Sequence, residues 1–201
     1  MADSNNIASV KLPALAWDIA ADIYFPADFD ESKKYPVIIV GHPTGSCKEQ
    51  TSGNIYSKQL AEHGFVAITF DASFQGESGG EPRFTEDPGF RVSDFSYVVD
   101  YLVTQPYVNE EKIGLIGICG GGGYAVAATM LDRRIKALAT VVGSNVGRLM
   151  REGFSNYDPL GMLEALAAQR TAEARGAASV VNDLLPPSLD FARDNGLTDV
   201  D

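Results

Sequence analysis

The chain has 201 residues, of which 45% are apolar and 21% charged, a composition typical of a globular protein with one sizeable core. Its net charge of −11 argues against binding to nucleic acid or to anionic membranes. No run of about 18 apolar residues is present, so we expect no membrane span. The polar start, residues 1–6, lacks the pattern of a signal peptide. The two cysteines, Cys47 and Cys119, show neither metal-ligand spacing nor a disulfide framework, so we expect a cytoplasmic protein without a metal site.

The first third of the chain predicts alternating strands and helices. Residues 17–25 alternate between apolar and polar positions, which indicates an early, half-exposed strand. Residues 37–40 form a continuous apolar run, typical of a buried parallel strand, and lead into a loop at 41–45. A helix over about 51–62, ended by a glycine, precedes a further strand at 65–70.

The middle of the chain continues the alternation. A long loop rich in glycine, proline and acidic residues covers 71–90. Phe95, Val98, Val99 and Leu102 then have the spacing of one helix face. An apolar strand at 113–118, a helix at 122–131 and an apolar strand at 135–142 follow. This order predicts a mostly parallel sheet with right-handed crossovers.

The last quarter of the chain has a helical pattern. Asp158-Pro159 is a suitable N-cap and first-turn pair and Gly176 a suitable stop, which predicts a helix over 159–175. A shorter helical stretch is expected over 177–185. The fold class is therefore α/β, with the sheet core in residues 1–145 and a partial helical cap in 146–201.

The stretch Gly117-Ile118-Cys119-Gly120-Gly121 carries the most chemical information. It has the form G-x-C-x-G between an apolar strand and a helix, which is a nucleophile-elbow pattern with cysteine in place of the usual serine. Small residues are needed around so sharp a turn, and the turn would hold a thiol at the amino end of a helix. Two alternatives stay open, a buried structural cysteine and a phosphate-binding loop, although the Lys-Ser/Thr of a P-loop is lacking.

Three motifs together resemble the α/β-hydrolases, and within them the dienelactone hydrolase-like group, which also carries cysteine in its G-x-C-x-G-G elbow. The elbow is one motif, matched by residues 117–122. Residues 41–45, Gly-His-Pro-Thr-Gly, resemble the His-Gly or His-Pro loop after the third strand of that group. Residues 71–80 resemble its Asp-x-x-G-x-G-x-S segment, which is shared with the X-prolyl peptidase-like acyl hydrolases. The resemblance covers about residues 15–145.

The resemblance implies a hydrolase that attacks ester, lactone or thioester bonds of a small-molecule acyl substrate, without a cofactor. Cys119 would be the nucleophile, and the main-chain N–H of Gly120 would be one oxyanion donor. The second donor would come from the loop at 41–45, where Thr44 is the better candidate because Pro43 has no N–H.

Three further residues are candidates for supporting roles near this site. His42 lies beside the presumed oxyanion loop, and Asp71 follows a strand at the sheet edge where ligands bind in α/β folds. Ordering of the loop through Ser73 or Ser78 is an alternative role for Asp71. Tyr124 lines a pocket or packs in the core.

The sequence departs from the hydrolase pattern in its general base and acid. In this fold the acid and the histidine follow the nucleophile, but both histidines, His42 and His63, precede Cys119. We therefore expect a chain that ends before the last two strands of the sheet, with a homo-oligomer covering the exposed edge. A non-catalytic interaction module and an acyltransferase are the alternative functions.

Overall fold

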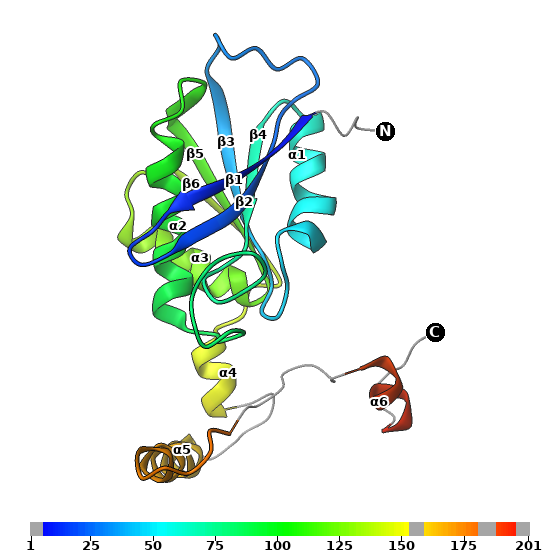
Figure 1. Cartoon of the computed structure of the whole chain (residues 1–201). Helices are drawn as coiled ribbons and strands as arrows, with labels where there is room; N and C mark the ends of the chain where they lie inside the picture. The colour runs from blue at the N-terminus through cyan, green and yellow to red at the C-terminus, as the bar shows by residue number, and fades with distance from the viewer. Residues whose placement is uncertain (1–5, 153–158, 181–187, 196–201) are drawn as a thin grey trace. The chain divides into compact units, whose positions relative to one another are not determined.

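The structure, a computed structural model, describes residues 6–152, 159–180 and 188–195 (Figure 1). Tertiary contacts divide the chain into two units, Met1–Val146 and Gly147–Asp201. Each unit is considered by itself.

The first unit is built on a six-stranded sheet with the order β1-β2-β4-β3-β5-β6. The strands β3, β4, β5 and β6 pair in parallel, whereas β2 is antiparallel to both of its neighbours. The strands are β1 (Ile7–Pro13), β2 (Asp18–Tyr24), β3 (Tyr35–Gly41), β4 (Val66–Phe70), β5 (Val108–Ile118) and β6 (Ala137–Val141). This is the expected α/β class with a mostly parallel sheet.

The central strands are apolar because helices cover both of their faces. Every residue of β4 is buried, which explains its uninterrupted apolar run. The expectation of a half-exposed strand at 17–25 was wrong, since Ile19–Tyr24 of β2 are all buried. Because consecutive residues of a strand point to opposite faces of the sheet, both faces of β2 are covered by other parts of the chain.

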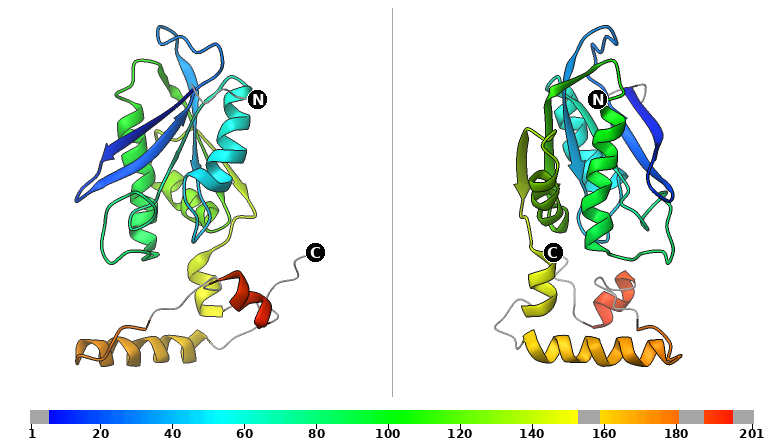
Figure 2. Two further views of the ribbon diagram at one scale, coloured as in Figure 1. Left: turned by 45° about the vertical axis from the view of Figure 1, so that its right-hand side comes forward. Right: turned by 90° about the vertical axis from the view of Figure 1, so that its left-hand side faces the viewer.

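The helices lie on both sides of the sheet (Figures 1 and 2). The π-helical segment η2 (Glu49–Ser57) continues into α1 (Lys58–Glu62) and joins β3 to β4. The next connection, through α2 (Pro88–Leu102), runs from β4 back across β3 to β5, and α3 (Gly120–Leu131) continues to β6. The crossover through α1 runs along the sheet in one direction, and the crossovers through α2 and α3 run in the other. Right-handed crossovers that run in opposite directions place their helices on opposite faces of the sheet, so α1 covers one face and the packed pair α2 and α3 covers the other.

Helix α2 begins earlier than the sequence pattern indicated. The predicted loop at 71–90 ends at Asp87, whose side chain caps the helix by accepting from the main-chain N–H groups of Gly89 and Phe90. Pro88 occupies the first helical turn, where a missing N–H costs nothing. The buried face contains the expected Phe95, and also a charged residue, Arg91.

The two outer strands of the sheet differ in character. β1 was not predicted, and most of its residues are partly or fully exposed. β6 was predicted, although Ala137–Thr140 are exposed in the structure. Among the described residues, β6 pairs with β5 alone, so one edge of this strand is open.

The second unit contains helical segments. Helix α4 (Val146–Glu152) starts at the unit boundary, and α5 (Pro159–Ala174) and α6 (Leu189–Asp194) follow. Helix α5 matches the predicted helix at 159–175, and Gly176 after it has a φ of 97°, as expected for a helix stop. The helix expected over 177–185 is not formed at 177–180, and its remaining residues, like the predicted cap Asp158, lie outside the described residues.

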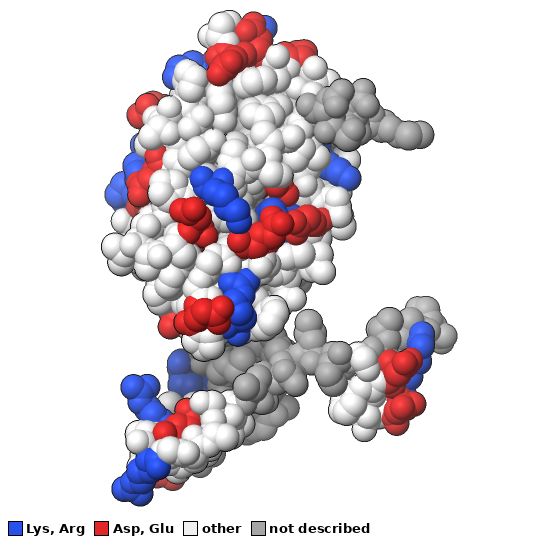
Figure 3. Space-filling model, in the orientation of Figure 1, with Lys and Arg blue, Asp and Glu red and all other residues white. Residues whose placement is uncertain are grey.

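The surface of the first unit carries charges of both signs. Figure 3 shows acidic and basic side chains side by side on the visible face of this unit, with no broad basic patch there. Within the described ranges, no helix is both long and apolar enough to cross a membrane.

Candidate active site

The loops after β3 and β5 meet at one point of the sheet edge. The two strands are neighbours and in register, with Gly41 opposite Gly117 at their carboxyl ends. The chain leaves β3 toward α1 on one face and leaves β5 toward α3 on the other. Such a divergence opens a crevice outside the strand ends, which is where ligands bind in open α/β sheets. The topology thus brings the loop at 41–45 and the elbow together.

Cys119 has the strained backbone of a sharp strand-to-helix turn. It stands between β5 and α3 with φ 54° and ψ −121°, a region that residues with a side chain rarely occupy. Its main-chain N–H donates to the Val141 carbonyl at 2.9 Å, and its carbonyl accepts from Gly122 and Ser144. The side chain is exposed. A strained backbone therefore presents a solvent-accessible thiol at the amino end of α3.

The glycines around Cys119 are required by close packing. A Cβ on Gly117 would lie 2.5 Å from the Gly121 carbonyl oxygen and 2.6 Å from the Cβ of Ala125. A Cβ on Gly121 would overlap the main-chain carbonyl of His42. The turn therefore lies directly against the loop after β3, and no larger side chain fits between them.

Thr44 and Gly120 lie in contact beside the thiol. A Cβ on Gly120 would overlap Oγ1 of Thr44. Among the described residues, neither the Gly120 N–H nor the Thr44 N–H donates to a protein acceptor. Two open N–H groups on adjacent loops, next to the thiol, are the components that an oxyanion hole needs.

His42 is buried and fully engaged within the loop. Its Nδ1 lies 2.7 Å from the Pro43 carbonyl, so we assign the proton to Nδ1. Its Nε2 then accepts from the Ala72 N–H at 3.1 Å and from Nη1 of Arg91 at 2.9 Å. Burial, and then the positive charge of Arg91, lower the pKa of His42 to about 3. The structure therefore places His42 as a neutral support of the loop, with no lone pair left for a proton from Cys119.

His63, the other histidine of the sequence, lies at the opposite edge of the sheet. It follows α1 and precedes the amino end of β4, whereas Cys119 follows the carboxyl end of β5. Its Nδ1 lies 2.7 Å from the carbonyl of Gln59, as expected for a residue at a helix end. Neither histidine is thus positioned as a base for Cys119.

Arg91, which the sequence analysis missed, connects the loop to helix α3. Its Nη2 donates to the His42 carbonyl at 2.8 Å, and its Nε lies 3.2 Å from Oε1 of Glu86. Its guanidinium lies over the Tyr124 ring, 5.1 Å from the ring centroid. One signal could have found it, because Arg91 precedes Phe95 by four residues and so lies on the apolar helix face. A charge on that face needs buried partners.

Tyr124 lies one turn into α3 and is 6% exposed. Its hydroxyl is buried, and no hydrogen-bond partner lies within 3.5 Å of it in the part of the chain that the structure describes. Burial, and then the negative charge of Glu86, raise the pKa of Tyr124 above its ordinary value. The structure therefore places a neutral hydroxyl against the acidic side chain that pairs with Arg91.

Asp71 is fully buried below the loop at 41–48. Its carboxylate accepts from the main-chain N–H groups of Lys48 and Glu77, each at 2.8 Å. Ser78 bonds to the main-chain carbonyl of Asp71 and not to its side chain. Ser73 bonds instead to Asp94, whose pKa burial raises to about 6. Asp71 thus orders the loop, through partners other than the expected serines.

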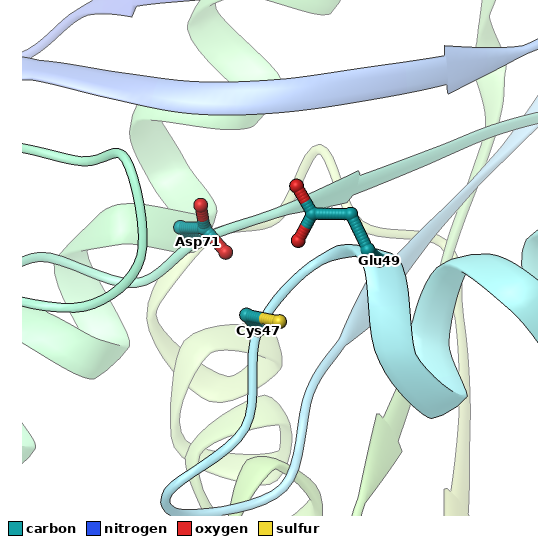
Figure 4. Close-up of side chains that lie close together, drawn as sticks. All are labelled: Cys47, Glu49 and Asp71. Atoms are coloured by element: carbon teal, nitrogen blue, oxygen red, sulfur yellow. The ribbon is translucent and has the colours of Figure 1, made fainter.

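Cys47, Glu49 and Asp71 offer three possible metal-ligand atoms that all lie within 4.8 Å of one another (Figure 4). The ammonium group of Lys48 lies among these acids. Its Nζ contacts Glu49 and lies 3.3 Å from Asp71 and 2.9 Å from Glu77. The Lys48 ammonium group therefore already supplies the positive charge that a metal ion would bring to these acids.

A hollow of about 370 Å³ lies far from the thiol. It is lined by Lys34, Val108, Asn109, Glu110 and Glu111. These residues surround the amino end of β5, whereas Cys119 follows its carboxyl end.

Comparison with known proteins identifies the family. Residues 17–181 match the X-Pro dipeptidyl-peptidase family (S15 family). The chain belongs to this family. This S15-family chain is similar to the hypothetical protein PA2218 from Pseudomonas aeruginosa. The crystal structure of PA2218 superposes with a TM-score of 0.80 at 36% sequence identity, and the match covers 94% of this chain and 61% of PA2218. The structure of the α/β-hydrolase GrgF from Penicillium superposes with a TM-score of 0.67 at 24% identity, over 95% of this chain and 65% of that one. The fold is that of the α/β-hydrolases.

Sequence relatives of this S15-family chain include proteins with and without named activities. The uncharacterized protein YcjY of Escherichia coli is 47% identical over 172 residues, which is 84% of this chain and 56% of YcjY. The polyketide transferase GrgF of Penicillium is 31% identical over 113 residues, which is 56% of this chain and 38% of that protein. The chain spans about half the length of the first of these relatives.

Proposed function

We propose that this chain carries the thiol nucleophile of an acyl hydrolase that cleaves ester, lactone or thioester bonds. One observation carries the proposal: Cys119 is an exposed thiol with positive φ at a strand-to-helix turn. This conformation is strained, and strain of this kind is retained where function requires it. Membership of a hydrolase family and of the α/β-hydrolase fold supports the same reaction class.

In the proposed reaction, Sγ of Cys119 forms a bond to the acyl carbonyl carbon. The carbonyl oxygen becomes an oxyanion that accepts from the N–H groups of Gly120 and Thr44. The bond to the leaving alcohol or thiol then breaks, and the proton lost by Cys119 ends on that leaving group. Water then attacks the acyl-enzyme, which releases the acid and returns the proton to sulfur. The described residues place no imidazole beside Cys119, so we expect slow turnover of this chain.

An acyltransferase is the second candidate, and the names of two relatives favour it, whereas a third relative is named for hydrolysis. GrgF is named a polyketide transferase, DrtE of Aspergillus calidoustus an acyltransferase, and AneE of Aspergillus aculeatus a thiohydrolase. Transfer and hydrolysis share the same acyl-enzyme and differ only in whether an acceptor or water attacks it. Product analysis with alcohol and amine acceptors separates the two.

The decisive experiment is acylation of Cys119 by p-nitrophenyl acetate. We expect a burst of nitrophenolate and an acetyl group located on Cys119 by peptide mass spectrometry. Cys119→Ala should abolish both, and Cys47→Ala is the matched control, because burial raises the pKa of the Cys47 thiol. An unchanged burst in Cys119→Ala would rule out the mechanism. A Cys119 that also reacts with iodoacetamide no faster than a model thiol would favour a non-catalytic interaction module.

We further propose that a second copy of the chain covers the open edge of β6 and that the second unit forms a partial cap. Unpaired strand edges are normally covered, and Leu138 on β6 is 38% exposed. The unpaired cysteines are consistent with a cytoplasmic location. Sedimentation tests the first point, and a monodisperse monomer would contradict it.

A further inference from the structure

The peptide unit that joins Pro43 to Thr44 carries one of the two candidate oxyanion donors. Its carbonyl oxygen belongs to Pro43 and its N–H to Thr44, and the unit is trans. A trans peptide unit is planar, and its C=O and N–H bonds point in opposite directions. Whatever holds the Pro43 carbonyl therefore also sets the direction of the Thr44 N–H.

A hydrogen bond from His42 holds this carbonyl. The ring of Pro43 fixes its φ, so ψ of Pro43 is the soft angle that turns the following peptide unit. Nδ1 of His42 lies 2.7 Å from the Pro43 carbonyl oxygen, which can only accept, so Nδ1 carries the proton. Within the described residues the Thr44 N–H donates to no protein acceptor, so the unit is hydrogen-bonded through its carbonyl alone.

The imidazole that makes this bond is fixed on its other side. The Ala72 N–H, which can only donate, lies 3.1 Å from Nε2 of His42, so Nε2 carries the lone pair. Nη1 of Arg91 lies 2.9 Å from Nε2 and 3.4 Å from Nδ1, so its shorter contact is to the same lone pair. Burial, and then the positive charge of Arg91, lower the pKa of His42 to about 3, so the ring is neutral at neutral pH. The surroundings of His42 thus select the tautomer that donates from Nδ1.

The fixed peptide unit directs its N–H away from the buried imidazole. His42 is 0% exposed, and the N–H points away from its ring because the carbonyl points toward it. Thr44 is partly exposed, and its side chain contacts Gly120, the residue after the exposed thiol of Cys119. A hydrogen bond to the carbonyl also polarises the peptide unit, which makes its N–H a stronger donor. His42 therefore affects both the direction and the strength of the Thr44 donor.

We propose that His42 is a positioning residue, whose Nδ1–H aligns the Pro43–Thr44 peptide unit so that the Thr44 N–H donates to the oxyanion formed at Cys119. This inference rests on the proposed acyl-enzyme function and adds to it a residue that acts through Thr44. In this role His42 exchanges no proton with Cys119.

Two amide variants of His42 separate positioning from general support of the loop. The amide nitrogen of Asn takes the place of Nδ1, whereas the amide group of Gln reaches the place of Nε2. His42→Asn therefore keeps a donor for the Pro43 carbonyl, and His42→Gln keeps an acceptor for the Ala72 N–H. Each variant loses one side of the imidazole, so they are matched controls for each other.

The readout is the ratio of two reactions of Cys119, measured in a Cys47→Ala background. Acylation by p-nitrophenyl acetate forms an oxyanion, whereas alkylation by iodoacetamide forms none, and both reactions need the same thiolate. We expect His42→Gln to lower the ratio of acylation to alkylation about tenfold, which is part of the roughly 10²–10³-fold cost of removing an oxyanion donor outright. His42→Asn should keep the wild-type ratio. A wild-type ratio in His42→Gln, or an equal fall in both variants, would overturn the inference.

A second measurement uses wild-type protein and does not depend on acylation. Long-range ¹H–¹⁵N NMR spectra show which ring nitrogen of His42 carries the proton, and ¹⁵N relaxation gives the order parameter of the Thr44 amide. We expect the proton on Nδ1 and a rigid Thr44 amide with an order parameter of about 0.85. If p-nitrophenyl acetate does not acylate Cys119, the acyl-enzyme proposal fails, and this result still supports alignment of the peptide unit by His42. A proton on Nε2, or an order parameter below about 0.6 at Thr44, overturns the alignment.

Discussion

Oγ1 of Thr44 fills the space that a Cβ on Gly120 would occupy. The two residues belong to loops 76 positions apart in the sequence, and their contact fixes the two candidate oxyanion donors next to each other. Gly120→Ala should destabilise the protein by about 1–3 kcal/mol through overpacking. Thr44→Ala in the same chain should restore most of this loss, because it removes the colliding atoms. Urea unfolding of the wild type, the two single variants and the double variant gives the coupling free energy between the two positions.

Gly121→Ala is the comparison for this cycle. Its Cβ would overlap a main-chain carbonyl of His42, which no side-chain change can move away. We expect Gly121→Ala to be more destabilising than Gly120→Ala and insensitive to Thr44→Ala. Additive effects of Gly120→Ala and Thr44→Ala would show that the two residues are not in contact.

The buried His42 should make stability depend on pH. Its pKa is about 3 in the folded state against 6.5 for an unperturbed histidine, so between these values the unfolded chain binds more protons. The contribution of His42 is therefore fully present above pH 6.5 and falls as the pH is lowered toward 3. Asp94 acts in the opposite direction, because its pKa is raised from 3.8 to about 6.

Comparison of wild type with His42→Gln isolates the histidine, since both proteins retain Asp94. Below pH 6.5, the free energy of unfolding of the wild type should fall relative to the variant by up to about 1.4 kcal/mol per pH unit. Urea unfolding between pH 4 and 8 measures the two slopes. Parallel curves would show that His42 titrates normally and is not held neutral.

Arg91 should contribute far more to stability than an exposed arginine. Arg91→Met keeps much of the side-chain volume but removes the counter-charge of Glu86 and the guanidinium donor of the His42 carbonyl. We expect a loss of about 2–4 kcal/mol, reduced from the value for a fully buried pair because Glu86 is partly exposed. Arg134→Met is the control, because the Arg134 side chain is 41% exposed. The loss of its ion pairs should lower the free energy of unfolding by about 1 kcal/mol or less. Equal losses in the two variants would contradict this assignment.

Lys48 should be essential for the loop that carries Thr44. Its side chain is 2% exposed, and its ammonium group neutralises Asp71, which is fully buried. Lys48→Met should cost about 3–5 kcal/mol, because it leaves a buried carboxylate without its counter-charge. Lys33→Met breaks an exposed pair and should cost about 1 kcal/mol or less. Thermal unfolding compares them, and a Lys48→Met protein as stable as Lys33→Met would disprove the role.

Much of the α/β pattern could be predicted because it is local. The apolar runs of β3, β4 and β5 and the glycine stop after α5 are properties of a few neighbouring residues. The missed strand β1 has only a short alternation of apolar and polar residues, Ala8 to Leu12, and its partly exposed residues are held by pairing with β2. The burial of β2 was missed for a related reason, because it depends on which distant segments pack on its two faces.

The sequence by itself determined the elbow, because a turn of this sharpness excludes side chains and therefore leaves a glycine pattern around Cys119. Only the tertiary structure decided what lies next to that elbow. The divergence of the chain after β3 and β5 brings Thr44 against Gly120, and burial of Arg91 on α2 joins His42, Glu86 and Tyr124 around it. These contacts join residues far apart in the chain, and the order of strands in the sheet sets them, which no local spacing encodes.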